Sequence, residues 1–153
     1  DKYQNGAYDL VLVFCDTDRK PYEQYVDIKR KINEFHGVEN AADKIMIYGN
    51  PCTMQIIIEH WGDVRLCSNN KKKNAPVIFD LTGIEGYKGR KEQRRELFSQ
   101  ITMENYQEMR ERISKLPVDD TVEGSTNFGR FLDWFSSDDC EWIRVINNML
   151  DYE

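Results

Sequence analysis

The stretch Tyr8-Asp-Leu-Val-Leu-Val-Phe-Cys15, which runs directly into Asp16-Thr-Asp18, decides how the fold of this 153-residue chain is predicted. Its residues are almost all apolar and include β-branched valines, and the run is too short for a helix. Such a run is typical of a strand covered on both faces, as in a parallel sheet. The sequence therefore predicts a buried strand that ends at two aspartates.

A helix and a second strand are predicted after this first strand. Beyond Pro21, apolar side chains recur at intervals of three and four residues, at Tyr22, Tyr25, Ile28, Ile32 and Phe35. That spacing places them on one face of a helix, with Pro21 in its first turn and Gly37 at its end. Lys44–Tyr48 then supplies a short strand. The three elements form a βαβ unit, for which we expect a parallel pair and a right-handed crossover.

The region after the second strand is less regular. We predict a helix over Cys52–Trp61, because the run is long and Pro51 suits a first turn, although Ile56-Ile57-Ile58 would also suit a strand. Three shorter segments are expected to be an extended piece, a loop and a second extended piece, at Val64–Cys67, Ser68–Asn74 and Pro76–Leu81.

The last third of the chain is predicted to be helical. Helices are expected from about Lys91, from Thr102 and around Phe128, and a final one around Trp142 with its N-cap at Ser137 or Asp138. The predicted fold class is therefore α/β. A small, mostly parallel sheet with flanking helices occupies residues 1–82. A helical extension over residues 83–153 packs on the same core, as one domain.

The composition indicates a folded protein that neither spans a membrane nor is secreted. Hydrophobic residues make up 40% of the chain, which is enough for a packed core. The longest apolar run, Leu10–Cys15, is far shorter than the ~20 residues that span a bilayer, and no basic segment leads into an apolar signal core. We expect a cytoplasmic protein with no membrane association. Because the chain opens on Asp1 without a methionine, we interpret it as a piece of a longer protein or a product whose start was removed.

The cysteines do not suggest a zinc site. No two of the four form a CxxC pair, and His36 and His60 are poorly spaced for zinc. Without a signal peptide, reduced thiols are expected rather than disulfides.

Positive charge is concentrated in one segment of this acidic chain, whose net charge is −6. Residues 69–95 carry eight basic and three acidic side chains, a net charge of +5 that leaves −11 for the rest. Such a patch can hold a phosphate backbone, and its candidate nucleic-acid-binding residues are Lys71, Lys72, Lys73, Lys88, Arg90, Lys91, Arg94 and Arg95. The alternative is a solvated loop followed by a helix with internal charge pairs.

Asp16 and Asp18 are the candidate metal ligands. They follow a predicted buried strand, and ligands of open parallel sheets bind at the carboxyl ends of the strands. Two carboxylates one residue apart can face a common cation, and oxygen ligands suit Mg²⁺ or Mn²⁺. Such a metal positions phosphate oxygens in phosphoryl transfer. Alternatively, the pair caps and solvates a turn.

A second group of candidate residues is Asn50-Pro51-Cys52, with His60 and Trp61 after seven intervening residues. Asn50 is expected to cap a helix that Pro51 begins, with Cys52 packed beneath it. His60 is a candidate general base or phosphate ligand if a partner side chain orients it. A structural role is the alternative for a lone histidine.

The two motifs together resemble the later part of a Toprim (topoisomerase–primase) domain, and in particular the RloB-like group found with restriction and phage-defence loci. The resemblance covers Tyr8–Trp61, about a third of the chain. It implies a Toprim-like α/β fold, metal binding by Asp16 and Asp18, and Mg²⁺-dependent cleavage or joining of nucleic-acid phosphodiesters.

The chain departs from this family in two places. Thr53 and Met54 stand where the RloB-like signature has an aromatic residue and a glutamate. Toprim proteins also carry an acid/base glutamate on a strand before the aspartate pair, and none of the fifteen residues before Asp16 is a glutamate. The resemblance therefore implies that the catalytic glutamate is missing from this chain, and that the chain is not a complete catalyst.

Two functions of different classes follow. The first is a nuclease-like, metal-dependent phosphodiester-processing domain of a defence or mobile-element protein, with nucleic acid as its partner. The second is a catalytically silent α/β module that binds a protein partner, which the helices around Trp134 and Trp142 would allow, although rings at helical spacing are typical of a core. A phosphatase with Asp16 as its nucleophile is disfavoured, because Arg19-Lys20 replace the usual glycine-containing turn.

Overall fold

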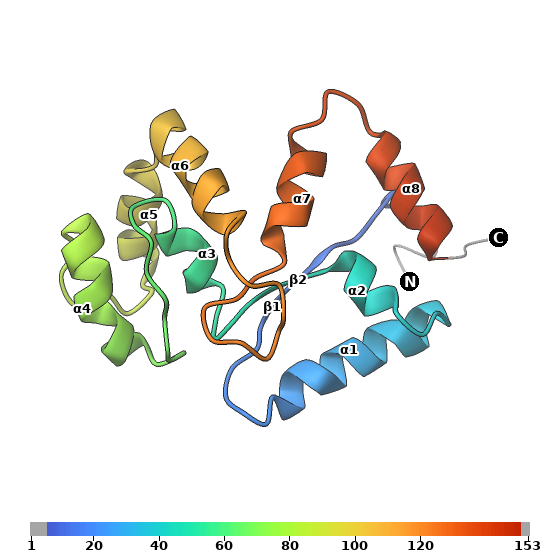
Figure 1. Cartoon of the computed structure of the whole chain (residues 1–153), viewed down its shortest axis with the longest axis horizontal. Coiled ribbons are helices and arrows are strands. Elements are labelled where there is room, and N and C mark those ends of the chain that lie inside the picture. The colour runs from blue at the N-terminus through green and yellow to red at the C-terminus, as the bar shows by residue number, and fades with distance from the viewer. Residues whose placement is uncertain (1–5, 151–153) are drawn as a thin grey trace.

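The computed structural model describes residues 6–150 and shows a mixed α/β fold with a two-stranded parallel sheet (Figure 1). The strands are β1 (Val13–Asp16) and β2 (Met46–Gly49). The helices are α1 (Glu23–His36), α2 (Ala41–Ile45), α3 (Met54–Ile58), α4 (Lys71–Thr82), α5 (Lys91–Ser99), α6 (Met103–Ile113), α7 (Phe128–Phe135) and α8 (Glu141–Met149).

The predicted strand–helix–strand unit is confirmed. β1 and β2 pair in parallel, with Val13 opposite Met46 and Asp16 opposite Gly49. Helix α1 ends as predicted at Gly37, whose φ of 68° lies in the left-handed region that glycine adopts without strain. The short helix α2 directly precedes β2, so the second strand begins at Met46 rather than at Lys44.

The two strands differ in burial, and the prediction that the first strand is covered on both faces is wrong. All four residues of β2 are buried. In β1, however, Cys15 is buried and Phe14 is 57% exposed. Successive side chains of a strand point to opposite faces, and in the described part of the chain β1 pairs along only one edge, with β2. Regular pairing also begins only at Val13, not at Tyr8.

The second edge of β2 is occupied by the segment that precedes α7. Gly49 forms an antiparallel bridge with Thr126, and Thr126 Oγ1 donates a hydrogen bond to the Tyr48 carbonyl over 2.6 Å. The Asn127 side chain accepts from the Tyr48 N–H at 3.0 Å and donates to the Met46 carbonyl at 2.8 Å. Side chains thereby replace part of the ladder that a third strand would provide.

Helix α4 contradicts two of the predicted segments. The loop expected over Ser68–Asn74 becomes helical at Lys71, because the Asn70 side chain accepts from the Lys72 N–H and caps the first turn. The extended segment expected over Pro76–Leu81 lies inside the same helix. Within this helix Ile78 is 1% exposed and packs against other helices. Burial of Ile78 in the folded protein therefore outweighs the preference of β-branched residues for strands and of proline against helix interiors.

The later helices follow the sequence more closely. α5 begins at Lys91 and α6 directly after its cap Thr102, both as predicted. The predicted N-cap of α8 at Ser137 or Asp138 is wrong: Cys140 occupies the N-cap position, directly before Glu141. Val64–Cys67 forms no strand.

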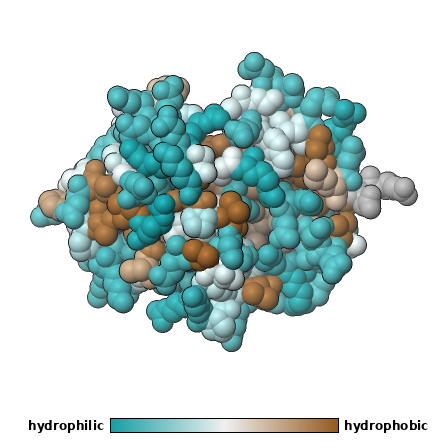
Figure 2. Space-filling view, in the orientation of Figure 1, coloured by the Kyte–Doolittle hydropathy of each residue, from teal (hydrophilic) through white to brown (hydrophobic). Residues whose placement is uncertain are grey.

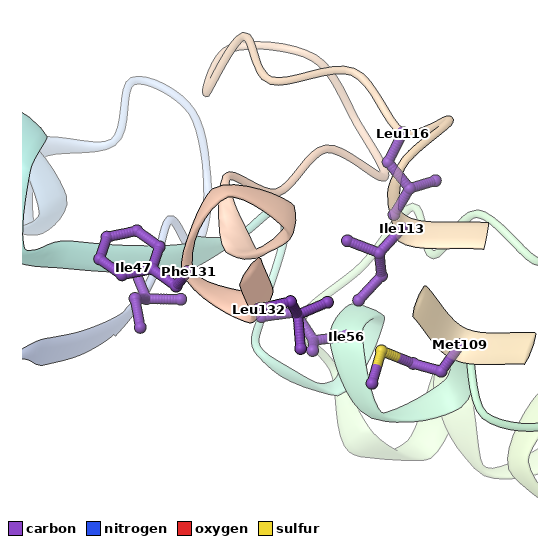
Figure 3. Close-up of a cluster of buried hydrophobic side chains, with 7 residues drawn as sticks. All are labelled: Ile47, Ile56, Met109, Ile113, Leu116, Phe131 and Leu132. Carbon is purple, nitrogen blue, oxygen red and sulfur yellow. The ribbon is translucent and has the colours of Figure 1, made fainter. Parts of the chain in front are cut away.

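One buried cluster joins the sheet to the helical half of the chain. In this cluster Ile47 of β2 packs with side chains of α3, α6, α7 and the segment after α6 (Figure 3), namely Ile56, Met109, Ile113, Leu116, Phe131 and Leu132. A second cluster holds α4 and α5 against α3, through Cys52, Ile58, Leu66, Ile78, Ile84, Tyr87 and Leu97. None of the helices within residues 6–150 is both long and apolar enough to cross a membrane.

We expect Asn127→Ala to lower the free energy of unfolding by about 2 kcal/mol, because the substitution leaves the Tyr48 N–H and the Met46 carbonyl of a buried strand without their partner. Urea unfolding followed by circular dichroism measures the change. Asn148→Ala, on the exposed face of α8, is the matched control. Equal stability of the two variants would show that Asn127 does not hold β2.

Candidate functional site

The candidate site lies where the two parallel strands end. The ladder continues past the strands, since the Thr17 N–H donates to the Gly49 carbonyl at 3.2 Å and the Asp18 N–H to the Pro51 carbonyl at 2.9 Å. The turn after β2 is so tight that a Cβ on Gly49 would lie 2.6 Å from the Cys52 carbonyl oxygen, which explains the glycine. The loops that follow β1 and β2 are therefore held side by side.

Both predicted metal ligands lie at this edge and are partly exposed. Asp16 Oδ1 accepts a hydrogen bond from the Thr53 N–H at 2.7 Å, and Asp18 Oδ1 accepts one from Asn69 Nδ2 at 2.7 Å. Asp18 adopts a φ of 60°, a left-handed conformation that aspartate tolerates better than most residues. The second oxygen of each carboxylate accepts no hydrogen bond from the described residues.

The two aspartates open onto neighbouring cavities rather than onto one. Asp16 lines a cavity of about 280 Å³ together with Lys71 and Arg94. Asp18 lines a second cavity of about 450 Å³, whose basic side chains are Arg19, Lys20 and Lys73. Asn69 lines both cavities and so marks their common boundary.

Three of the eight predicted nucleic-acid-binding residues line the same cavities as the aspartates, namely Lys71, Lys73 and Arg94. The other five line neither cavity: Lys72, Lys88, Arg90, Lys91 and Arg95. Sequence reasoning missed Arg19 and Lys20 as cations of this site, although they follow Asp18 directly. It also missed Asn69, which lies just before α4 and whose side chain donates a hydrogen bond to Asp18.

The carboxylates of Asp16 and Asp18 are oxygen ligands of the kind that Mg²⁺ and Mn²⁺ take. Residues 6–150 contain no group of three or more His, Cys, Asp and Glu side chains that would form an all-protein metal cluster. Mg²⁺ commonly binds through one or two carboxylates and keeps water or substrate phosphate as its other ligands. Asp16 and Asp18 each have one carboxylate oxygen that no described residue engages, but the two side chains line different cavities.

His60 is not brought together with the aspartates. Its Nδ1 lies 2.9 Å from the Ile57 carbonyl oxygen at the end of α3, and His60 lines neither cavity. Burial of the ring lowers the pKa of His60 below its ordinary value. In this position a neutral His60 completes the hydrogen bonding at the end of α3.

Asn50 does not cap a helix, contrary to the prediction. Helix α3 begins only at Met54, and Asn50 is 1% exposed. Its Nδ2 donates to the Asp120 carbonyl at 2.7 Å and to the Tyr22 hydroxyl at 3.1 Å, while its backbone bonds to Gly124 and Ser125. Asn50 thereby ties the distant segment 120–125 to the carboxyl edge of the sheet.

The four cysteines form no disulfide in the structure. Cys52 is buried in the cluster beneath α3, and burial raises the pKa of its thiol to about 11. Cys52 is therefore protonated at neutral pH and packs as a small apolar side chain.

A buried acid, Glu59, lies at the end of α3 and lines neither cavity. Glu59 is fully buried, and its Oε1 accepts from Gln55 Nε2 at 2.6 Å and from the Arg65 guanidinium at 3.4 Å. Its Oε2 has no hydrogen-bond partner in the described part of the chain. Burial is the main cause that raises the pKa of Glu59 to about 7.

The stability of the protein should therefore depend on Glu59 between about pH 4.5 and pH 7. In that window the folded state binds more protons than the unfolded state, so the free energy of unfolding falls as the pH rises, by at most ~3 kcal/mol. We expect Glu59→Gln to remove this decrease, as measured by urea unfolding across the pH range. Asp63→Asn removes an exposed acid that also pairs with Arg65 and should retain the decrease. If both variants kept the wild-type slope, Glu59 would not be the titrating group.

No protein family model, curated protein or solved structure matches this chain.

Proposed function

We propose that the chain forms a Toprim-like, Mg²⁺-dependent domain that processes nucleic-acid phosphodiesters in a defence or mobile-element protein. One observation carries the proposal. Asp16 and Asp18, at the carboxyl end of a parallel strand, line two adjoining cavities whose walls also bear basic side chains. Carboxylates beside cations are the combination that a metal ion and a phosphodiester require together.

The metal ion, the aspartates and the basic side chains have different roles in this proposal. When bound, Mg²⁺ supplies positive charge that positions phosphate oxygens and stabilises the charge developing on them. Asp16 and Asp18 would hold the cation through their carboxylates. Lys71, Lys73 and Arg94 bind the phosphates on either side, with charge-assisted hydrogen bonds to their oxygens.

The general base of a cleavage step is not assigned to a residue of this chain. No glutamate occurs among residues 1–15, and His60 faces the end of α3 rather than either cavity. We therefore propose that these 153 residues bind metal and phosphodiester, and that cleavage needs a general base from outside them.

We expect wild-type protein to bind Mg²⁺ and Mn²⁺ in titration calorimetry, and the Asp16→Asn, Asp18→Asn double variant to lose at least about tenfold in affinity, because it removes both ionised ligands. The double variant Asp138→Asn, Asp139→Asn makes the same change in charge at two adjacent exposed aspartates and is the matched control.

Equal affinity in all three proteins would overturn the metal site. Nicking assays on plasmid DNA and on RNA with each metal then separate the two function classes. Metal binding without binding or cleavage of nucleic acid would favour the catalytically silent interaction module.

A further inference from the structure

The cavity beside Asp16 is lined by this acidic side chain, by two basic side chains and by several apolar ones. Lys71 and Arg94 supply its cations, and its apolar side chains include Met54, Ile57, Tyr87 and Phe98. Figure 2 shows the surface as mainly hydrophilic, with separate hydrophobic patches, some of them on the side where Figure 1 places α4 and α5. A ligand that fills this cavity needs both a negatively charged and an apolar part.

The two cations of the cavity are available to an anion. Neither Lys71 nor Arg94 forms an ion pair with a carboxylate of the described residues. Both side chains lie next to Gly89. Arg94 Nη1 donates to the Gly89 carbonyl at 3.0 Å. The Lys71 ammonium lies 3.4 Å from the position that a Cβ on Gly89 would take. Two such cations next to Asp16 suit a phosphate group.

The aromatic and amide side chains that line the cavity suit a flat ring with a polar edge. Phe98 lies in the last turn of α5 and is 51% exposed, whereas Tyr87 is buried. Asn74, also in this cavity, is 5% exposed and donates from Nδ2 to the Ser68 carbonyl at 2.8 Å. Its Oδ1 accepts no hydrogen bond from the described residues, so this acceptor remains for a ligand.

The geometry points to an unpaired nucleotide as the ligand of this cavity. The base stacks on Phe98 with its polar edge at Asn74, and its phosphate lies between Lys71 and Arg94, next to Asp16. The bases of an intact duplex are stacked and paired in its interior, so only a single-stranded or extruded nucleotide can enter a cavity of about 280 Å³. This inference rests on the proposed function and names its substrate class as single-stranded nucleic acid.

The test compares binding of single-stranded and duplex oligonucleotides by fluorescence anisotropy, with the wild-type chain in EDTA so that metal binding plays no part. Labelled 12-mers of DNA and of RNA are each used alone and as blunt duplexes. We expect at least about tenfold tighter binding of a single strand than of its duplex, since an exposed aromatic ring beside cations stacks unpaired bases. Phe98→Ala should lose about tenfold on the single strand and leave duplex binding unchanged.

The matched control is Phe79→Ala, which removes a phenylalanine of similar exposure, 46%, from α4 outside the cavity. It should leave binding of both forms unchanged. In addition, 2-aminopurine within the single strand should lose fluorescence on binding to wild-type protein, which reports stacking without any substitution.

Duplex binding as tight as single-strand binding, or equal effects of Phe98→Ala and Phe79→Ala, would overturn this inference and leave the proposed nucleic-acid function standing. Absence of binding to any of the oligonucleotides, both in EDTA and in a repeat with Mg²⁺, would overturn both.

Discussion

The parallel pairing of β1 with β2 is the constraint on which the rest of the structure depends. Because the strands run in the same direction, their carboxyl ends meet at one edge, and the hydrogen bonds from Thr17 and Asp18 extend the pairing into both loops. This brings Asp16 and Asp18 next to Pro51 and Thr53, more than thirty residues later. The site is thus a consequence of strand direction rather than of any local motif.

The second edge of the sheet is completed by side chains instead of by another strand. Thr126 and Asn127 bond to the backbone of β2, and Asn50 binds the segment at Asp120 in return. These contacts, together with the cluster around Ile47, connect a short sheet to a large helical half. A buried polar side chain is costly unless it is hydrogen-bonded, so Asn50 and Asn127 specify this arrangement as well as stabilise it.

Charge in this protein is organised at the same edge. The basic segment is far from the aspartates in sequence, but α4 and α5 pack against α3 through the cluster around Ile58 and carry Lys71 and Arg94 to Asp16. Five of the eight cations of the segment line neither cavity. An even spread of the eight cations would hold a phosphate backbone non-specifically, whereas this arrangement concentrates three of them beside two carboxylates.

The sequence by itself determined the elements whose signals are local. Periodicity predicted α1, and other local signals predicted the glycine cap at Gly37 and the starts of α5 and α6. The apolar runs predicted a parallel pair of strands, the first of which runs into Asp16 and Asp18. Tertiary structure alone decided that Pro76 lies within a helix, that Phe14 is exposed, and that Asn50 bonds to a carbonyl seventy residues away. The physical reason is that caps and periodicity act within a few residues, whereas burial and the pairing of buried polar groups depend on segments that only folding brings into contact.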